Sequence, residues 1–208
     1  MDNKKYSEVF SIEEARELVA YIKEALGENI IKDITIEEDE YSFYDPDDEM
    51  IGYSTDYEDE DQEHFMIKYM NSEFGTNMPD DIRFWGMFSV LHELGHHVDL
   101  SSRDKENLEE YHEQNMKKYD IINDKSRKHA KEFYATVLEM ELLIDLFDIG
   151  EATEEDLENI LARHDKLVIE KKTLDYEYRQ LESERVADAW AAFFLKTFIE
   201  NKETKFSY

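Results

Sequence analysis

Residues 79–100 read PDDIRFWGMFSVLHELGHHVDL, and this stretch organises our interpretation of the whole chain. Its apolar residues recur at helical spacing, and Asp80 and Asp81 stand where the helix dipole favours negative charge. The pattern predicts a helix with one buried face, formed by Phe84, Met87, Phe88, Leu91, Leu94 and Val98. Because each residue turns the helix by about 100°, His92 and His96 project from one face, one turn apart.

The spacing His-Glu-x-x-His suits a metal site. Two imidazoles one turn apart can reach the same tetrahedral zinc ion, and Glu93, about 100° from His92, lies beside the metal rather than over it. This position suits a general base that takes a proton from a zinc-activated water. The alternative is two surface histidines on a charged helix. Gly95 costs about 1 kcal/mol of helix stability relative to Ala, a cost that is worth keeping if backbone or substrate must pass close by.

A zinc ion with two histidines needs a further protein ligand. A metzincin site would require Gly at position 99 and His at position 102, but the chain has Asp99 and Ser102. The predicted helix 174–201 carries Glu184 and Asp188 one turn apart. Glu184 could bind zinc while Asp188 accepts the ring N–H of a zinc-bound histidine. Small side chains around the pair would let two helices approach closely: Ala187, Ala189, Ala191 and Ala192. The alternative is a polar stripe beside an alanine-rich packing face.

Together, HELGH at 92–96 and ERVADAWAAFFL at 184–195 resemble the gluzincin group of zincin-like metallopeptidases. Among these, the second segment is most similar to the ImmA/IrrE-like proteases, whose pattern is matched by Glu184, Ala187, Asp188, Trp190 and Ala191. The resemblance implies a zincin-like fold with a Zn²⁺ held by His92, His96 and Glu184. It also implies Glu93 as base and Asp188 as support for a ligand. The interval between the two motifs is longer than in compact members, so their substrate specificity is not carried over.

The expected fold class is α+β and zincin-like, in a single domain spanning 1–208. Ser11 and Glu14 form a capping box before a helix at 12–26, with Gly27 after it. A small, mostly antiparallel sheet is expected from the runs 29–37, 41–44, 50–54 and 64–71. Helical runs follow at 105–122, 126–147, 154–171 and 174–201. The domain thus comprises helix plus sheet (1–78), active-site helix (79–100), helical insertion (101–173) and third-ligand helix with tail (174–208).

Composition limits the partners and the compartment. The chain has 53 acidic and 24 basic residues, a net charge of −29, so its surface repels phosphate backbones and anionic lipids. We therefore expect no direct nucleic acid binding. We also expect no membrane association, because no segment reaches the length needed to span a bilayer. With no cysteine, the chain forms no disulfide, and a metal must rely on His, carboxylates and water. A cytoplasmic location is expected, and the oligomeric state stays open.

Two functions compete. The first is a zinc peptidase that hydrolyses a protein or peptide substrate, bound as an extra strand at an edge of the sheet. The second is a catalytically silent zincin-fold interaction module, with the helical insertion as its working surface. We interpret His97 as a residue behind the ligands or at the surface rather than as a ligand. Candidates for stabilising an oxyanion are Tyr111, His112, His129, Tyr134, Tyr176 and Tyr178.

Overall fold

The computed structural model describes residues 10–27, 30–55, 60–78, 82–103 and 105–202. The chain divides into two compact units. The first unit comprises Met1–Leu108 and Ser183–Tyr208, and the second unit is Glu109–Glu182. Where the sequence predicts one domain with an insertion at 101–173, the structure thus separates a compact unit at Glu109–Glu182. In the described part of the chain, no helix has an apolar stretch long enough to cross a bilayer.

The first helix, α1 (Ile12–Leu26), has the ends that its sequence predicts. The Glu14 N–H donates to the Ser11 hydroxyl, and the Glu14 carboxylate accepts from the Ser11 N–H, which completes the capping box. Gly27 follows the helix with a φ of 88°, a conformation that a residue without Cβ adopts readily. The inner face of α1 is buried, with Leu18 and Ile22 in the core.

The sheet has three strands, β1 (Thr35–Glu38), β2 (Phe43–Asp45) and β3 (Met50–Tyr53), in the order β1-β3-β2. β1 pairs with β3 in parallel and β2 pairs with β3 antiparallel. The sheet is therefore mixed, and the prediction of a mostly antiparallel sheet was wrong. The predicted strand at 64–71 was also wrong, because these residues belong to the helix α2 (Glu60–Phe74).

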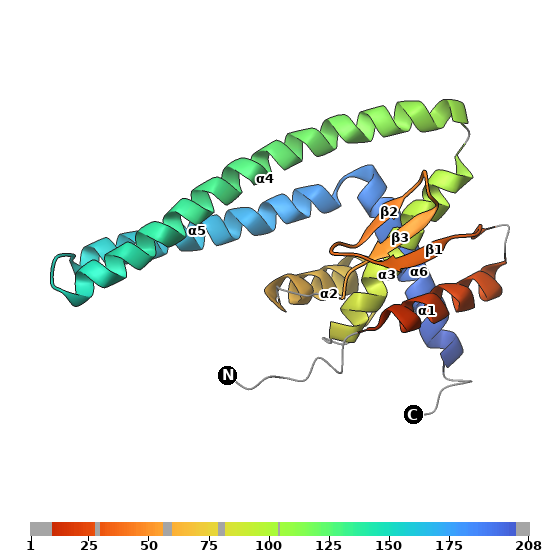
Figure 1. Ribbon diagram of the computed structural model, residues 1–208, viewed down its shortest axis with the longest axis horizontal. Coiled ribbons are helices and arrows are strands. Elements are labelled where there is room, and N and C mark those ends of the chain that lie inside the picture. Colours follow the sequence, from red (N-terminus) through yellow and green to blue (C-terminus); the bar gives the residue numbers. More distant parts are fainter. Residues whose placement is uncertain (1–9, 28–29, 56–59, 79–81, 104, 203–208) are drawn as a thin grey trace. The chain divides into compact units, whose positions relative to one another are not determined.

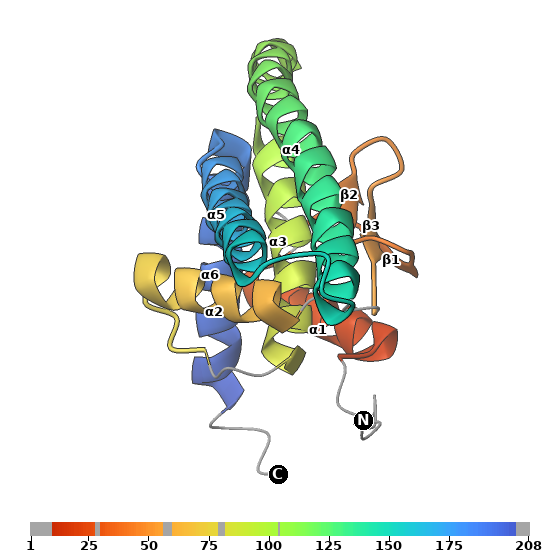
Figure 2. The ribbon, with the colours of Figure 1, turned by 90° about the vertical axis from the view of Figure 1, so that its left-hand side faces the viewer.

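Both motif helices contribute side chains to the core of the first unit. These helices are α3 (Ile82–Ser102) and α6 (Glu182–Lys202), drawn in Figures 1 and 2. Residues 79–81 of the predicted first turn lie outside the described part of the chain. α3 also contacts β2, β3 and α1. Fully buried side chains join these elements into one cluster, among them Ile22, Ile51, Phe88, Leu91, Leu94, Phe194 and Leu195. Since apolar burial is the main driving force of folding, this cluster fixes α3 against α6.

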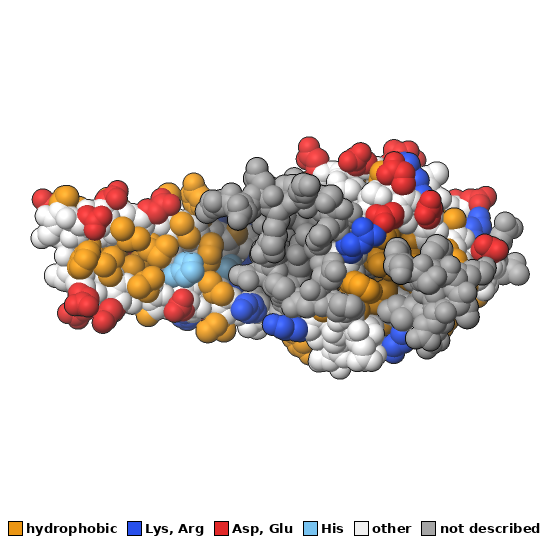
Figure 3. All heavy atoms as spheres, turned by 90° about the horizontal axis from the view of Figure 1, so that it is seen from below, with side chains coloured by type: hydrophobic (Ala, Val, Ile, Leu, Met, Phe, Trp, Pro, Cys, Tyr) orange, Lys and Arg blue, Asp and Glu red, His pale blue; other side chains and the backbone are white. Residues whose placement is uncertain are grey.

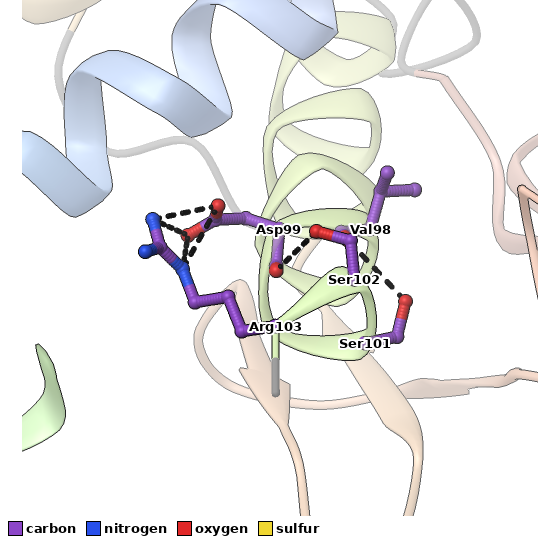
Figure 4. A network of polar contacts seen from close by, with 5 residues as sticks. All are labelled: Val98, Asp99, Ser101, Ser102 and Arg103. Atoms are coloured by element: carbon purple, nitrogen blue, oxygen red, sulfur yellow. Dashed lines mark hydrogen bonds and ion pairs between the residues drawn. The ribbon is translucent and has the colours of Figure 1, made fainter. Parts of the chain in front are cut away.

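The last turn of α3 is closed by its own side chains (Figure 4). Arg103 donates to both carboxylate oxygens of Asp99, at 2.9 to 3.2 Å. The Ser102 hydroxyl donates to the Asp99 carbonyl at 2.8 Å, and Ser101 does the same to Val98 at 3.3 Å. The Ser102 bond occupies the Asp99 carbonyl, one of the last four carbonyls, which a helix end leaves without intrahelical partners. Asp99 and Ser102, the positions that exclude a metzincin site, therefore take part in closing the end of α3.

The second unit is a helical hairpin of α4 (Lys105–Asp148), which starts in the first unit, and α5 (Glu154–Arg179). The predicted break between residues 122 and 126 is absent, because α4 is continuous. The predicted break near residue 172 was displaced, since α5 ends at Arg179 and α6 begins at Glu182. Gly150, at a φ of 78°, lies in the connection, and Thr153 caps α5 through reciprocal bonds with Asp156.

A seven-residue repeat joins the two helices of the hairpin, as in an antiparallel coiled coil. In α4 the buried or partly buried residues that follow this repeat are Asn115, Ile122, Ser126, His129, Phe133, Thr136, Met140 and Leu143. In α5 they are Leu157, Ile160, His164, Leu167, Leu174, Tyr178 and Leu181, the last just beyond the helix end. Contacts between the rings of Phe133 and His164, and between the His129 Nε2 and the Leu167 carbonyl at 2.7 Å, fix the alignment.

Candidate metal centre

Three side chains from the two motif helices converge within the first unit. His92 and His96 project from α3, and their Nε2 atoms lie 3.2 Å apart. Glu184 projects from α6, with Oε2 at 3.2 Å from the His92 Nε2 and Oε1 at 3.6 Å from the His96 Nε2. Among the residues that the structure describes, these three form the one His, Asp or Glu group compact enough to share a metal ion.

The spacing of these ligand atoms fits a tetrahedral zinc ion. Zinc bonds of about 2.0–2.2 Å place two ligand atoms of a tetrahedron about 3.3–3.6 Å apart. Here the two Nε2 atoms lie 3.2 Å apart, the His92 Nε2 lies 3.2 Å from the Glu184 Oε2, and the His96 Nε2 lies 3.6 Å from the other Glu184 oxygen, Oε1, which is close to this spacing. Two imidazole nitrogens and one carboxylate also form a ligand set that catalytic zinc sites use, with a fourth position left for water or substrate. Both the distances and the chemistry of the donors therefore suit zinc.

Asp188 fixes the orientation of His92. Its Oδ1 lies 2.8 Å from the His92 Nδ1, the contact that the one-turn spacing of Glu184 and Asp188 predicts. Since a carboxylate accepts hydrogen bonds, Nδ1 donates, and neutral His92 keeps its lone pair on Nε2. That lone pair faces the Glu184 carboxylate and the His96 Nε2. Such an arrangement of electron-rich atoms is stabilised by a cation or a proton between them.

Burial strengthens the electrostatic argument. His92 is 5% exposed, Glu184 6% and Asp188 fully buried. Two carboxylates in such a setting repel one another and lose hydration, which costs several kcal/mol per ion unless nearby charge compensates. A divalent cation at His92, His96 and Glu184 would supply that compensation. These buried polar side chains therefore have the composition of a cation-binding site.

Gly95 explains how α6 comes close enough to contribute Glu184. A Cβ at this position would lie 2.6 Å from the Ala187 carbonyl oxygen, 2.9 Å from the Ala187 Cα and 3.0 Å from the Trp190 Cβ. The backbone of α6 thus passes directly over Gly95, as the sequence predicts. Ala187 is also fully buried, so small residues on both helices allow the approach.

Glu93 follows His92 on α3 and is half-buried. Its side chain leaves the helix about 100° from that of His92, so it is adjacent to the metal ligands without being one of the three convergent groups. A carboxylate in this position can accept a proton from a water molecule that approaches the metal.

His97 is fully buried and lies outside the convergent group, so of the two positions expected for it, the one at the surface is excluded. Its Nδ1 lies 3.0 Å from the hydroxyl of Tyr44 on β2, and the two rings meet edge to face. Burial lowers the pKa of His97, which keeps the ring neutral. Burial, with Glu49 and Asp45 nearby, raises the pKa of Tyr44 to about 12. The pair joins β2 of the sheet to α3.

The residues proposed for an oxyanion belong to the other unit. All six candidates, Tyr111, His112, His129, Tyr134, Tyr176 and Tyr178, lie within Glu109–Glu182. His129 and Tyr178 take part in contacts between α4 and α5, which is a structural role. Sequence reasoning missed Tyr44, because a single tyrosine in a short polar strand gives no sign of which helix it will contact.

Comparisons of the chain with protein-family models, with curated proteins and with solved structures each gave no match.

Proposed function

We propose that the first unit is a zinc-dependent metallopeptidase of the gluzincin type, similar to the ImmA/IrrE-like proteases, which hydrolyses peptide bonds of a protein substrate. The observation that carries the proposal is the convergence of His92, His96 and Glu184 from two helices at ligand-to-ligand separations of 3.2 to 3.6 Å. The presence of Glu93 beside these groups favours an enzyme, because a silent interaction module needs no proton acceptor there.

Each side chain has a distinct role in this proposal. His92, His96 and Glu184 would hold the zinc ion, and Asp188 keeps the His92 lone pair directed at it. Bound zinc supplies Lewis acidity, which polarises the scissile carbonyl and makes water a stronger acid. Glu93 accepts the proton of the attacking water as the new C–O bond forms. It then donates that proton to the departing amine nitrogen as the C–N bond breaks, which leaves Glu93 ready for another cycle.

The sheet offers one edge that suits an extended substrate. On the β1 edge, Arg16 donates to the Ile36 carbonyl through Nε at 3.1 Å and Nη2 at 2.9 Å, which occupies a backbone acceptor. The other edge is β2, and its Tyr44 contacts α3 next to His96. We therefore assign the substrate strand to β2, where main-chain hydrogen bonds would align the peptide along the metal-binding helix.

Metal content tests this proposal. Wild type is expected to bind about one zinc per chain, measured by elemental mass spectrometry after dialysis against a weak chelator. His96→Ala and Glu184→Ala each remove a ligand and should lose most of the metal. The matched controls are His112→Ala and Glu182→Ala, which change exposed residues and should retain it. Full zinc occupancy in both ligand variants, or equal loss in the controls, would contradict the assigned site.

A further inference from the structure

The two flanks of the hairpin differ in chemistry. On one flank, α4 and α5 are joined by ion pairs between Lys125 and Glu177 at 2.6 Å and between Arg163 and Glu139 at 2.8 Å. The opposite flank has apolar residues at most of the equivalent heptad positions, with Tyr134 at the adjoining position, and we call these residues the apolar flank: Met116, Ala130, Tyr134, Val137, Ile144, Leu161 and Val168. Figure 3 shows a face of the hairpin on which hydrophobic side chains gather between acidic ones.

Several of these apolar residues are well exposed. Tyr134 is 67% exposed, Leu161 50%, Ile144 47% and Met116 43%. In a coiled coil, apolar residues beside the central seam widen the buried stripe and favour bundles of more than two helices. A patch of this kind typically marks a protein interaction site. The apolar flank therefore fits further helices lying along the hairpin.

The distribution of charge along the hairpin indicates which helices would bind to the apolar flank. The tip half, residues 132–165, has 11 acidic residues and one basic residue. The base half, residues 117–131 and 166–179, has ten basic and five acidic residues. The rest of the chain is acidic too, so the base half stands out as a positive surface. A second hairpin laid in the opposite direction places each acidic tip on a basic base, whereas a hairpin in the same direction opposes like charges.

Individual positions match this antiparallel arrangement. Arg127, Tyr134 and Glu141 follow one another at seven-residue intervals beside the apolar flank of α4. A two-fold axis at Tyr134 therefore brings Arg127 of each copy to Glu141 of the other. The side chains of Arg127 and Glu141 are exposed, and neither forms an ion pair with a residue that the structure describes.

α5 gives the same axis independently. Glu158, Asp165 and Lys172 also follow one another at seven-residue intervals beside the apolar flank. An axis at Asp165 brings Glu158 of each copy to Lys172 of the other, although Asp165 then meets its own copy unfavourably. Phe133 contacts His164 across the hairpin, so the axes at Tyr134 and Asp165 lie at the same level. The charged residues of α4 and those of α5 therefore favour the same two-fold symmetric arrangement.

We propose that the apolar flank of the hairpin binds a second copy of this chain, forming an antiparallel four-helix bundle in which α4 lies against α4 and α5 against α5. The interface is isologous: the same surface is used by both copies, and Arg127 pairs with Glu141 twice. This inference concerns the second unit and is independent of the peptidase proposal.

Charge reversal in the full-length chain tests the proposal, with dimer dissociation measured by sedimentation equilibrium. Wild type is expected to be a dimer at micromolar concentration. Arg127→Glu and Glu141→Arg should each raise the dissociation constant about 10-fold or more, since each places like charges together twice. Mixing the two variants should restore the dimer. One copy then carries an acidic residue at both positions 127 and 141 and the other copy carries a basic residue at both, so that opposite charges meet twice. Lys128→Glu, a reversal at the neighbouring residue that points elsewhere, is the matched control and should leave dimerisation unchanged.

Circular dichroism checks that every variant keeps its helix content. Restoration of the dimer in the mixture shows that the loss in each single variant comes from the reversed charge rather than from misfolding. A chain that is monomeric up to about 100 µM would overturn the proposal, as would a dimer that neither reversal weakens. Two weakened variants whose mixture stays weakened would also overturn it, because the pairing of Arg127 with Glu141 would then be absent. Burial of the apolar flank by an unrelated protein, with the chain itself monomeric, counts against the proposal in the same way.

Discussion

Gly95→Ala is expected to destabilise the first unit, although alanine normally stabilises a helix. The added Cβ would lie 2.6 Å from the Ala187 carbonyl oxygen, where ordinary contact begins at 3.4 Å, so α3 and α6 must separate by about 0.8 Å. Overpacking of this kind costs about 1–3 kcal/mol, and a clash with backbone lies at the upper end. The gain in helix propensity of about 1 kcal/mol offsets part of this. The net loss is therefore about 2 kcal/mol.

Urea unfolding followed by tryptophan fluorescence measures this loss, because both tryptophans, Trp85 and Trp190, belong to the first unit. With a typical dependence of about 2 kcal/mol per molar urea, the midpoint should fall by roughly 1 M. Adding Ala187→Gly should not rescue the variant, because the clash is with backbone atoms of residue 187. A midpoint that rises, as for a solvent-exposed helical glycine, would refute the close approach of α3 to α6.

The other predictions concern the surroundings of the metal and the choice of partners. Asp188→Ala should weaken zinc affinity about 10–100-fold in competition with a chelating dye, because His92 loses the partner that orients it; an unchanged affinity would mean that Asp188 is only a packing residue. Tyr44→Phe should lower the free energy of unfolding by about 1–3 kcal/mol in urea, since the buried His97 loses its hydrogen bond, and equal stability would show that the bond contributes nothing. Fluorescence anisotropy should detect no binding of duplex DNA at physiological salt, and tight, salt-sensitive binding would contradict the charge argument.

The candidate site could be predicted from sequence because its geometry is local to each helix. The one-turn spacing of His92 and His96, and of Glu184 and Asp188, follows from helical periodicity alone. Gly95 and the alanines around Glu184 indicated that two helices come together. By contrast, the contact between Tyr44 and His97 joins residues far apart in sequence, and no periodic pattern specifies such a pair.

The errors in the fold have similar physical causes. Residues 64–71 are rich in β-formers, but their buried members Met66, Ile67, Tyr69 and Met70 recur at helical spacing and pack as a helix. Strand direction depends on which strands meet, and that is a tertiary choice. The apparent break near Asn123 reflects weak local helix formers, which the seven-residue repeat of the hairpin overrides.

The proposed mechanism requires Glu93 to accept a proton beside a bound zinc ion. The most direct measurement incubates wild type and Glu93→Gln with a mixed peptide library and counts new peptide N-termini by mass spectrometry, with zinc content determined in both proteins. The account predicts equal zinc and equal stability, because Glu93 is not a ligand, together with a rate about 10²–10⁴-fold lower in the variant. Cleavage by Glu93→Gln at the wild-type rate would contradict it, as would zinc-loaded wild type that cleaves no peptide.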